Sequence, residues 1–239
     1  MMNEGCAVLI GGGGGIGRSL VERLRSRNTP VVVASRDQTH HHELDVDSVS
    51  CDARDFSAVE QVLVQATERH GGVTQLVCLA GSILLKPAHM TNAEEWQETI
   101  ATNLTTAFAC VRAAGKTMSS GGSVVLVSTV AAGTGLSNHE AIAAAKGGIE
   151  GLVRSAAATY AGRNLRFNAV APGLVDTPLA TRITKSERAL EHSKKMHPLG
   201  RIGTPADVSS AIDWLLSSES GWVTGQVVGI DGGLGAIRS

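Results

Sequence analysis

The sequence predicts a single α/β domain built on a doubly wound parallel sheet, and three observations support this fold class. The 239 residues lie within the range of one α/β domain and are enough to bury a large core. Hydrophobic residues make up 43% and charged residues 18%, as in a folded globular protein. Short apolar runs alternate with longer segments of helical period, which is the rhythm of a βαβ fold. Since no linker interrupts this rhythm, residues 1–239 are expected to form one unit.

The strands are predicted from short apolar runs, several of which lack polar alternation, as expected for parallel strands buried on both faces. They cover residues 6–10, 31–34, 75–79, 123–127, 165–170 and 226–230. The helices are predicted between them, over residues 16–27, 56–70, 93–118, 138–161 and 205–217. The polar and charged stretch 178–204 falls outside the rhythm and is predicted to be a substrate lid.

Charge and composition exclude several function classes. The net charge of −1 provides no attraction for nucleic acid or an anionic membrane, and 3% aromatic residues offer few stacking platforms. No apolar run approaches the roughly 18 residues that span a bilayer. Four cysteines without a CxxC pair predict reduced, mostly buried thiols in a cytoplasmic protein. His40, His41 and His42 lack a matching ligand set, so a solvated loop is favoured over a metal site, and no metal is expected.

A glycine run directly follows the first predicted strand and opens a helix. Two frames fit it, G-x-G-x-x-G and G-x-x-x-G-x-G. In either frame glycine lets the backbone turn tightly and approach a pyrophosphate, whose charge rests on the N-terminus of the helix. The strand before and the helix after the run are the context that a Rossmann-type dinucleotide site requires. The residues concerned are Gly11, Gly12, Gly14, Gly15, Ile16 and Gly17.

The end of the second predicted strand indicates which nucleotide is bound. An acidic residue there would bind the ribose 2′-hydroxyl of NAD and repel a 2′-phosphate. This chain has Ser35 and Arg36, and a hydroxyl with a guanidinium suits a 2′-phosphate. We therefore expect NADP(H) to be favoured over NAD(H), although Asp37 stands next to the pair and Arg36 as a solvated loop residue is the alternative.

Further motifs follow in order along nearly the whole chain. The carboxylate of Asp52 follows a short polar stretch, and Asn103 opens Asn-Leu-Thr-Thr-Ala-Phe. The others are Cys78-Leu79-Ala80-Gly81, Phe167-Asn168-Ala169-Val170-Ala171-Pro172-Gly173 followed by Thr177, Gly200-Arg201-Ile202-Gly203-Thr204-Pro205, Val223-Thr224-Gly225-Gln226 and Asp231-Gly232-Gly233.

Together with the glycine loop, these motifs resemble the short-chain dehydrogenase/reductase family. The resemblance implies that Asp52 contacts the adenine and that the loop from Pro172 to Thr177 contacts the nicotinamide side. Ala80 and Gly81 stand in the motif where the family usually has Asn-Asn-Ala-Gly. It also implies hydride transfer between a nicotinamide and a carbonyl or alcohol, and a homo-oligomer, a dimer or a tetramer.

The resemblance fails at the catalytic tyrosine. In the family, a tyrosine four residues before a lysine acts as general acid and base, and a serine thirteen residues before that tyrosine polarises the substrate oxygen. Lys146 matches the lysine and Asn103 the helix asparagine, but Ile142 stands where the tyrosine is expected. Tyr160 is the only tyrosine and lies fourteen residues beyond Lys146, too far along a helix to substitute for it. Thr129 matches the serine by spacing, with Ser128 as the next candidate.

His139 is the candidate replacement for the missing tyrosine. It lies seven residues before Lys146, so the two side chains would share one helix face, and an enoyl reductase branch of the family has its tyrosine at this spacing. Imidazole donates protons near neutral pH. Ser137 and Glu140 also form a predicted capping box, which would put His139 in the first helical turn, where the dipole disfavours its charged form. A partly exposed residue without a catalytic role is the alternative.

The sequence is therefore compatible with two functions. The first is an NADP(H)-dependent oxidoreductase acting on a carbonyl, an alcohol or an activated double bond, with His139 or a water as proton donor. The second is a catalytically silent NADP-binding protein with a regulatory or assembly role, and Ile142 motivates it. The partner is expected to be a small-molecule substrate. A locally basic lid would attract an acidic or carrier-linked one, although such a charge run is more often a solvated helix face. The lid cations are Arg182, Lys185, Arg188, Lys194 and Lys195.

Overall fold

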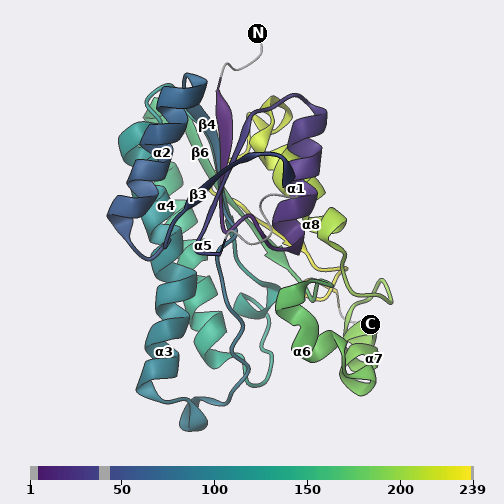
Figure 1. Ribbon diagram of the computed structural model, residues 1–239. Helices are drawn as coiled ribbons and strands as arrows, with labels where there is room; N and C mark the ends of the chain where they lie inside the picture. The colour runs from purple at the N-terminus through teal and green to yellow at the C-terminus, as the bar shows by residue number, and fades with distance from the viewer. Residues whose placement is uncertain (1–4, 38–43, 238–239) are drawn as a thin grey trace.

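The computed structural model describes residues 5–37 and 44–237, and its core is a parallel sheet of seven strands with helices on both faces (Figure 1). The strand order is β3-β2-β1-β4-β5-β6-β7. The chain adds β1, β2 and β3 toward one edge of the sheet and β4 to β7 toward the other, so the order of strands reverses between β1 and β4. This is the doubly wound fold that the sequence predicts. The strands are β1 (Cys6–Ile10), β2 (Val31–Ser35), β3 (Asp47–Ser50), β4 (Val73–Cys78), β5 (Gly122–Val127), β6 (Leu165–Pro172) and β7 (Val227–Ile230). His40, His41 and His42 lie outside the described residues.

The helices form one layer on each face of the sheet (Figure 1). The first layer comprises α2 (Phe56–His70), α4 (Thr106–Thr117) and α5 (Glu140–Tyr160), and the second comprises α1 (Gly15–Ser26) and α8 (Pro205–Leu216). Beyond the sheet lie α3 (Ala93–Ile100) on the side of the first layer, and α6 (Thr181–Thr184) and α7 (Glu187–Met196) on the other side. None of the helices described is long and apolar enough to cross a membrane.

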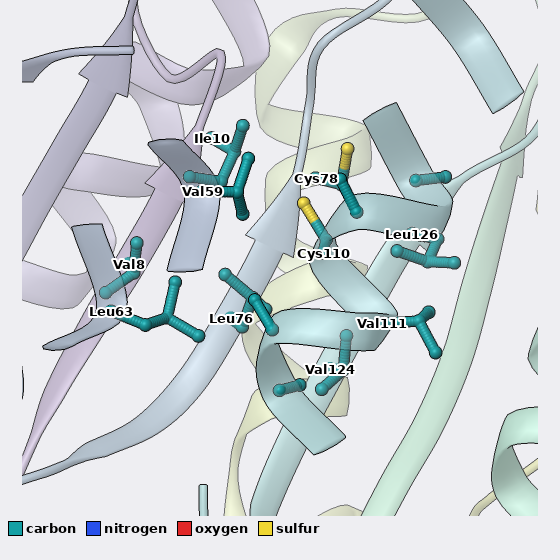
Figure 2. Packing of buried hydrophobic residues seen from close by; sticks show 14 of the residues in the cluster. Val8, Ile10, Val59, Leu63, Leu76, Cys78, Cys110, Val111, Val124 and Leu126 are labelled. Carbon is teal, nitrogen blue, oxygen red and sulfur yellow. The ribbon is translucent and has the colours of Figure 1, made fainter. Parts of the chain in front are cut away.

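Alternation along the strands divides the core into two clusters, one under each layer. In β1, Val8 and Ile10 pack toward α2 and α4, whereas Ala7 and Leu9 pack toward α1 and α8. All five residues of β1 are buried, as expected for a central parallel strand. The first cluster includes Cys78 and Cys110, which lie together between β4 and α4 (Figure 2). All four cysteines are unpaired and buried, as predicted from the sequence.

Two elements differ from the sequence prediction. The first is β3, which sequence analysis missed because three of its four residues are polar and the strand alternates between partly buried and exposed positions at the edge of the sheet. The second is the helix predicted over 93–118. It is divided into α3, a π-helical turn η3 (Ala101–Thr105) and α4. Apolar periodicity does not reveal such a turn, because the hydrophobic face continues through it.

The predicted start of the helix over 138–161 is also wrong. The helix α5 begins at Glu140 with His139 as its N-cap, and no side chain caps it. The expected capping box of Ser137 and Glu140 does not form, since Asn138 adopts a left-handed conformation with φ of 64° and breaks the helical path. By contrast, capping boxes do form at α3, from Asn92 and Glu95, and at α8.

The tight packing of α1 against the glycine loop generates the first prediction. A side chain at Gly17 would overlap the backbone of Gly12, whereas a Cβ at Gly14 would meet no atom within 4 Å. We expect Gly17→Ala to lower the free energy of unfolding by about 1–3 kcal/mol, because the loop and α1 must separate. Urea denaturation of both variants measures this, with Gly14→Ala as the matched control that stays within about 0.5 kcal/mol of the wild type. Equal stability of the two variants would contradict the prediction.

Candidate active site

The candidate site is a cavity of about 700 Å³ at the carboxyl edge of the sheet. It opens where the strand order reverses between β1 and β4, the place where parallel α/β sheets bind ligands. The cavity brings together most residues that the sequence singled out, although they are spread over more than 160 positions of the chain. They are Gly11, Gly14, Gly15, Ile16, Gly17, Gly81, Asn103, Ser128, Thr129, His139, Lys146, Pro172, Gly173 and Thr177. Four predicted residues do not line it, namely Ser35, Arg36, Asp52 and Ala80.

The loop from Gly11 to Gly14 connects β1 to α1. Gly11 has φ of 80°, and a Cβ there would lie 2.6 Å from the amide nitrogen of Ala80. Gly17 packs on the carbonyl of Gly12, and Gly15 lies beside Thr177. Positions 11 and 17 therefore both need glycine, which supports the frame Gly11-x-x-x-Gly15-x-Gly17. Since Gly14 is the N-cap and no side chain caps α1, the N–H groups of its first turn are available to an anion.

Ser35, Arg36 and Asp52 lie at the same edge, next to the cavity. The register of β2 on β3 pairs Ser35 with Ser50, which brings the following residues of both strands close together. The Ser35 hydroxyl donates to the Asp37 carbonyl at 2.6 Å, and Arg36 is exposed. Asp52 forms an ion pair with Arg54 at 2.6 Å. The hydrogen bond from Arg54 lowers the pKa of Asp52 to about 2, and the charge of Arg36 contributes to the same shift.

Asn103 lies in the π-helical turn η3 and is completely buried. Its amide nitrogen donates to the Thr99 carbonyl at 2.9 Å and to the Ser82 hydroxyl at 3.1 Å. Its side-chain oxygen accepts from the Ser82 backbone N–H at 3.1 Å. These bonds fasten the turn to the segment that follows β4, so Asn103 also fixes the position of Gly81. A Cβ at Gly81 would lie 3.0 Å from the Asn103 oxygen and 3.4 Å from the Lys146 ammonium.

Lys146 projects from α5 and is 7% exposed. Its ammonium group donates to the Val127 carbonyl at 2.8 Å. Burial lowers the pKa of Lys146 from 10.5 to about 8, and the neighbouring Cys78 opposes this shift. The hydrogen bond from Cys110 and the charge of Lys146 in turn lower the pKa of the Cys78 thiol. One turn before Lys146, Ile142 is buried and lines the same cavity, and its side chain has no proton to exchange.

Ser128 and Thr129 follow β5, and the structure distinguishes between them. The Ser128 hydroxyl donates to Glu150 at 2.9 Å and lies 3.3 Å from the Lys146 carbonyl, so it faces helix α5. The Thr129 hydroxyl accepts from the Ala131 N–H at 3.3 Å and keeps its own proton for another acceptor. Thr129 is therefore the better donor to a ligand oxygen, in agreement with its spacing in the sequence.

His139 lies at the N-cap of α5 on the cavity wall. Its Nδ1 is 2.8 Å from the Ser137 carbonyl. A carbonyl only accepts hydrogen bonds, so Nδ1 carries a proton and Nε2 is the nitrogen that gains or loses one. His139 is the N-cap of the helix and does not lie in its first turn, and its carbonyl accepts the first helical hydrogen bond, from the Ala143 N–H at 2.7 Å. The cavity contains both His139 and Lys146.

Sequence reasoning missed the histidines of the lid. His197 is 3% exposed, its Nδ1 donates to the Ser193 carbonyl at 2.6 Å, and its Nε2 accepts from the Leu174 N–H at 3.2 Å. With both nitrogens engaged, it fastens the end of α7 to the loop after β6. A Cβ at Gly173 would lie 2.5 Å from its Nε2. In the sequence, only Gly173 signals this contact, and no motif connects Gly173 with position 197.

His192 is the second lid histidine on the cavity wall. It is exposed and lies on α7. Across the described ranges, no three His, Cys, Asp or Glu side chains gather as they would around a metal ion.

Residues 11–235 match the family described as enoyl-(acyl carrier protein) reductase. The chain is 33% identical to cis-4-hydroxycyclohexanecarboxylate dehydrogenase of Sinomonas cyclohexanicum, over 98% of both chains. It is also 30% identical to the 3-oxoacyl-[acyl-carrier-protein] reductase MabA of Mycobacterium tuberculosis, over 95% of this chain and 92% of that protein.

Solved structures share the fold across the whole chain. A short-chain type dehydrogenase/reductase from Mycobacterium ulcerans superimposes with a TM-score of 0.93 at 26% identity, covering 99% of this chain and 91% of that one. Levodione reductase superimposes with the same TM-score and identity over the full length of both chains. The glycine loop, Asn103 and Lys146 thus lie in a fold whose relatives are dehydrogenases and reductases, and the chain belongs to the short-chain dehydrogenase/reductase family of oxidoreductases.

Proposed function

We propose that this protein is an NADP(H)-dependent oxidoreductase that reduces a carbonyl or an activated double bond, or oxidises the matching alcohol, with an atypical proton donor. One observation carries the proposal. A single cavity joins an uncapped helix start after a glycine loop to the buried Lys146 and Asn103. In a catalytically useless pocket, burying a lysine would only lower stability.

The residues of the cavity fit a nicotinamide dinucleotide. A Cβ at Gly14 would meet open space, so the backbone there leaves room for a pyrophosphate. Thr177 lies beside Gly15 and closes the other side of this space. Lys146 would hold the nicotinamide ribose, together with the loop of Pro172 and Gly173. When bound, the cofactor supplies or accepts the hydride.

The proposed preference for the phosphorylated cofactor depends on Ser35 and Arg36. Asp52, which follows the neighbouring strand β3, is committed to Arg54 and so is less able to repel a 2′-phosphate. Arg36 is exposed at the edge where the adenosine would end. A guanidinium binds a phosphate through paired hydrogen bonds, which an ammonium or a hydroxyl cannot match.

His139 is the proposed proton donor. Ile142 cannot serve, and Ser128 is engaged with Glu150. The Ser137 carbonyl holds the His139 ring, so the exchangeable proton is on Nε2 when the imidazole is charged. Thr129 would orient the substrate oxygen, and a water that exchanges protons with His139 would extend its reach.

Lys146 contributes a charge that depends on pH. With a pKa of about 8, it is mostly protonated at neutral pH and loses its charge in mildly alkaline solution. A buried ammonium favours negative charge nearby and stabilises an oxyanion that develops on the substrate. The same burial makes the folded protein bind this proton less tightly than the unfolded chain does.

A catalytically silent NADP-binding protein is the second candidate, and Ile142 favours it. If no proton donor operates, the cavity binds the dinucleotide and reports its presence to a partner. The two candidates differ in turnover but not in cofactor binding.

The substrate class, the oligomeric state and the compartment are proposed from the relatives and from the sequence. One relative is named for a carboxylate, a hydroxycyclohexanecarboxylate, and another for an oxoacyl group on a carrier protein. We propose a small acidic or carrier-linked substrate here, a homo-oligomer that is a dimer or tetramer, and a cytoplasmic location. The alanines Ala113, Ala114, Ala156 and Ala157 of α4 and α5 are buried in the core, so they do not provide an oligomer surface.

Calorimetric titration of the purified protein with NADPH and NADH tests the cofactor. We expect tighter binding of NADPH, and we expect Arg36→Ala to weaken it about tenfold because a charge-assisted phosphate contact is lost. NADH binding should change little. The control is Arg154→Ala, an exposed position on α5 that does not line the cavity. Tighter binding of NADH would overturn the cofactor preference, and binding of neither would overturn the oxidoreductase proposal.

The proton donor is tested with His139→Ala and Ile142→Tyr. Turnover is followed by NADPH absorbance with a panel of ketones, aldehydes and enones. His139→Ala should reduce kcat by about 10²-fold or more, as expected for the loss of a general acid, without weakening NADPH binding. Ile142→Tyr should restore turnover in the His139→Ala background. Unchanged kcat in His139→Ala would exclude that role, and activity that appears only after Ile142→Tyr would favour the silent protein.

The buried charge of Lys146 predicts a rise in stability with pH. Between pH 8 and 10.5 the unfolded chain binds more protons than the folded one, so the free energy of unfolding increases with pH over this window. Relative to Lys146→Met, the wild type should gain about 3 kcal/mol between pH 7 and 10.5, measured by urea denaturation. Lys185→Met, an exposed lid variant, should keep the wild-type dependence. If the difference in the free energy of unfolding between the wild type and Lys146→Met did not change with pH, the prediction would be contradicted and Lys146 would not be desolvated.

A further inference from the structure

We propose that Arg182 binds a carboxylate of the substrate, so that the ligand of this cavity is a compact apolar molecule with one anionic end. The inference rests on the proposed function, since it names the substrate class of the same site. It rests on the charged residues of the cavity, on its apolar walls and on the hydrogen bonding of Arg182.

The cavity has an uneven distribution of charge. None of the described residues that line it is Asp or Glu. Its basic side chains other than histidine are Lys146, beside Asn103, and Arg182, on the short helix α6 of the lid. The other titratable groups on its wall are His139, His192 and His197. An anion that enters therefore meets no acidic side chain to repel it, and it meets a guanidinium on the lid side.

The walls between these two cations are largely apolar. Leu179, Ile183 and Met196 contribute from the lid side. Ile83, Leu85 and Leu136 contribute from the segments after β4 and β5. Such walls favour a hydrocarbon body and reject a ligand that is polar throughout.

Arg182 is exposed and has no protein partner. It makes no hydrogen bond or ion pair with any residue in the described ranges. Two other cations of this region are engaged, since Lys194 pairs with Glu191 at 2.7 Å and Arg201 pairs with Asp207 at 2.7 Å. A guanidinium without a partner at the rim of an apolar cavity is suited to bind a carboxylate through two parallel hydrogen bonds.

The position of Arg182 favours a small carboxylate over a carrier-linked acyl group. A carrier phosphate would remain outside the cavity and would be met by the outer cations of the lid. Arg182 lines the cavity, whereas Lys185, Arg188 and Lys195 do not. Arg182 is therefore the lid cation that the acid group of a ligand inside the cavity would reach.

Isothermal titration with matched acids and amides tests the inference. The probes are cyclohexanecarboxylate against cyclohexanecarboxamide, and octanoate against octanamide, which differ in charge but hardly in shape. Each is titrated into the full chain with and without NADPH. We expect the wild type to bind at least one acid about tenfold more tightly than its amide. Arg182→Ala should abolish that preference, and Arg182→Lys should retain part of it.

Arg188→Ala is the matched control, because Arg188 is an exposed lid arginine outside the cavity. It should leave the preference for the acid unchanged. Equal binding of acid and amide, no binding of either pair, or a preference that survives in Arg182→Ala would overturn the inference. Loss of the preference in Arg188→Ala alone would indicate an outer anion site instead. Failure of the proposed function would show separately, as an absence of NADPH binding in the same titrations.

Discussion

The parallel hydrogen-bond ladder from β1 through β4 and β5 to β6 places the carboxyl ends of these strands along one edge of the sheet. Everything in the candidate site depends on this constraint. The glycine loop leaves β1, Gly81 follows β4, Thr129 follows β5, and Pro172 ends β6. Each segment is short, so a one-residue slip in register would move its side chain away from the cavity. The apolar residues on both faces of the strands hold that register, because they must fill two separate clusters at once.

The site combines close backbone packing with a buried charge. Gly11 and Gly17 let the loop lie against Ala80 and against its own Gly12. Lys146 lies in the same region and keeps its charge in part through the Val127 carbonyl. One turn before Lys146, the buried side chain of Ile142 makes this region more apolar still.

The segment 178–204, which the sequence predicts to be a lid, is joined to the loops after β6 and β7 by backbone hydrogen bonds of Leu199 and Gly203 and by the His197 side chain. His197 uses both ring nitrogens to connect the end of α7 to the Leu174 backbone, and Gly173 leaves the space that its ring needs. The short helices α6 and α7 extend from this anchor and carry both apolar and cationic side chains. The lid therefore contributes to the wall of the cavity and to its charge, while its outer face keeps ion pairs such as that between Lys194 and Glu191.

Much of the fold and the membership of the site follow from the sequence. Apolar runs and helical periods predicted the parallel sheet, and the glycine run was found from the strand before it and the helix after it. Asn103, Thr129 and Lys146 were identified by the resemblance of their motifs to the short-chain dehydrogenase/reductase family. Their side chains lie near the strand ends that carry them, so local pattern and sheet topology together determine that they meet. The absence of a tyrosine before Lys146 is likewise determined by the sequence alone.

Only the tertiary structure decided how these groups are used. The π-helical turn at Asn103, the start of α5 at Glu140, the engagement of Ser128 with Glu150 and the role of His197 each depend on a partner far away in the chain. Hydrogen bonds between distant segments leave no periodic trace in a sequence, because any polar residue that meets the partner's geometry suffices. The desolvation of Lys146 is decided in the same way, since burial is a property of all the elements packed around it.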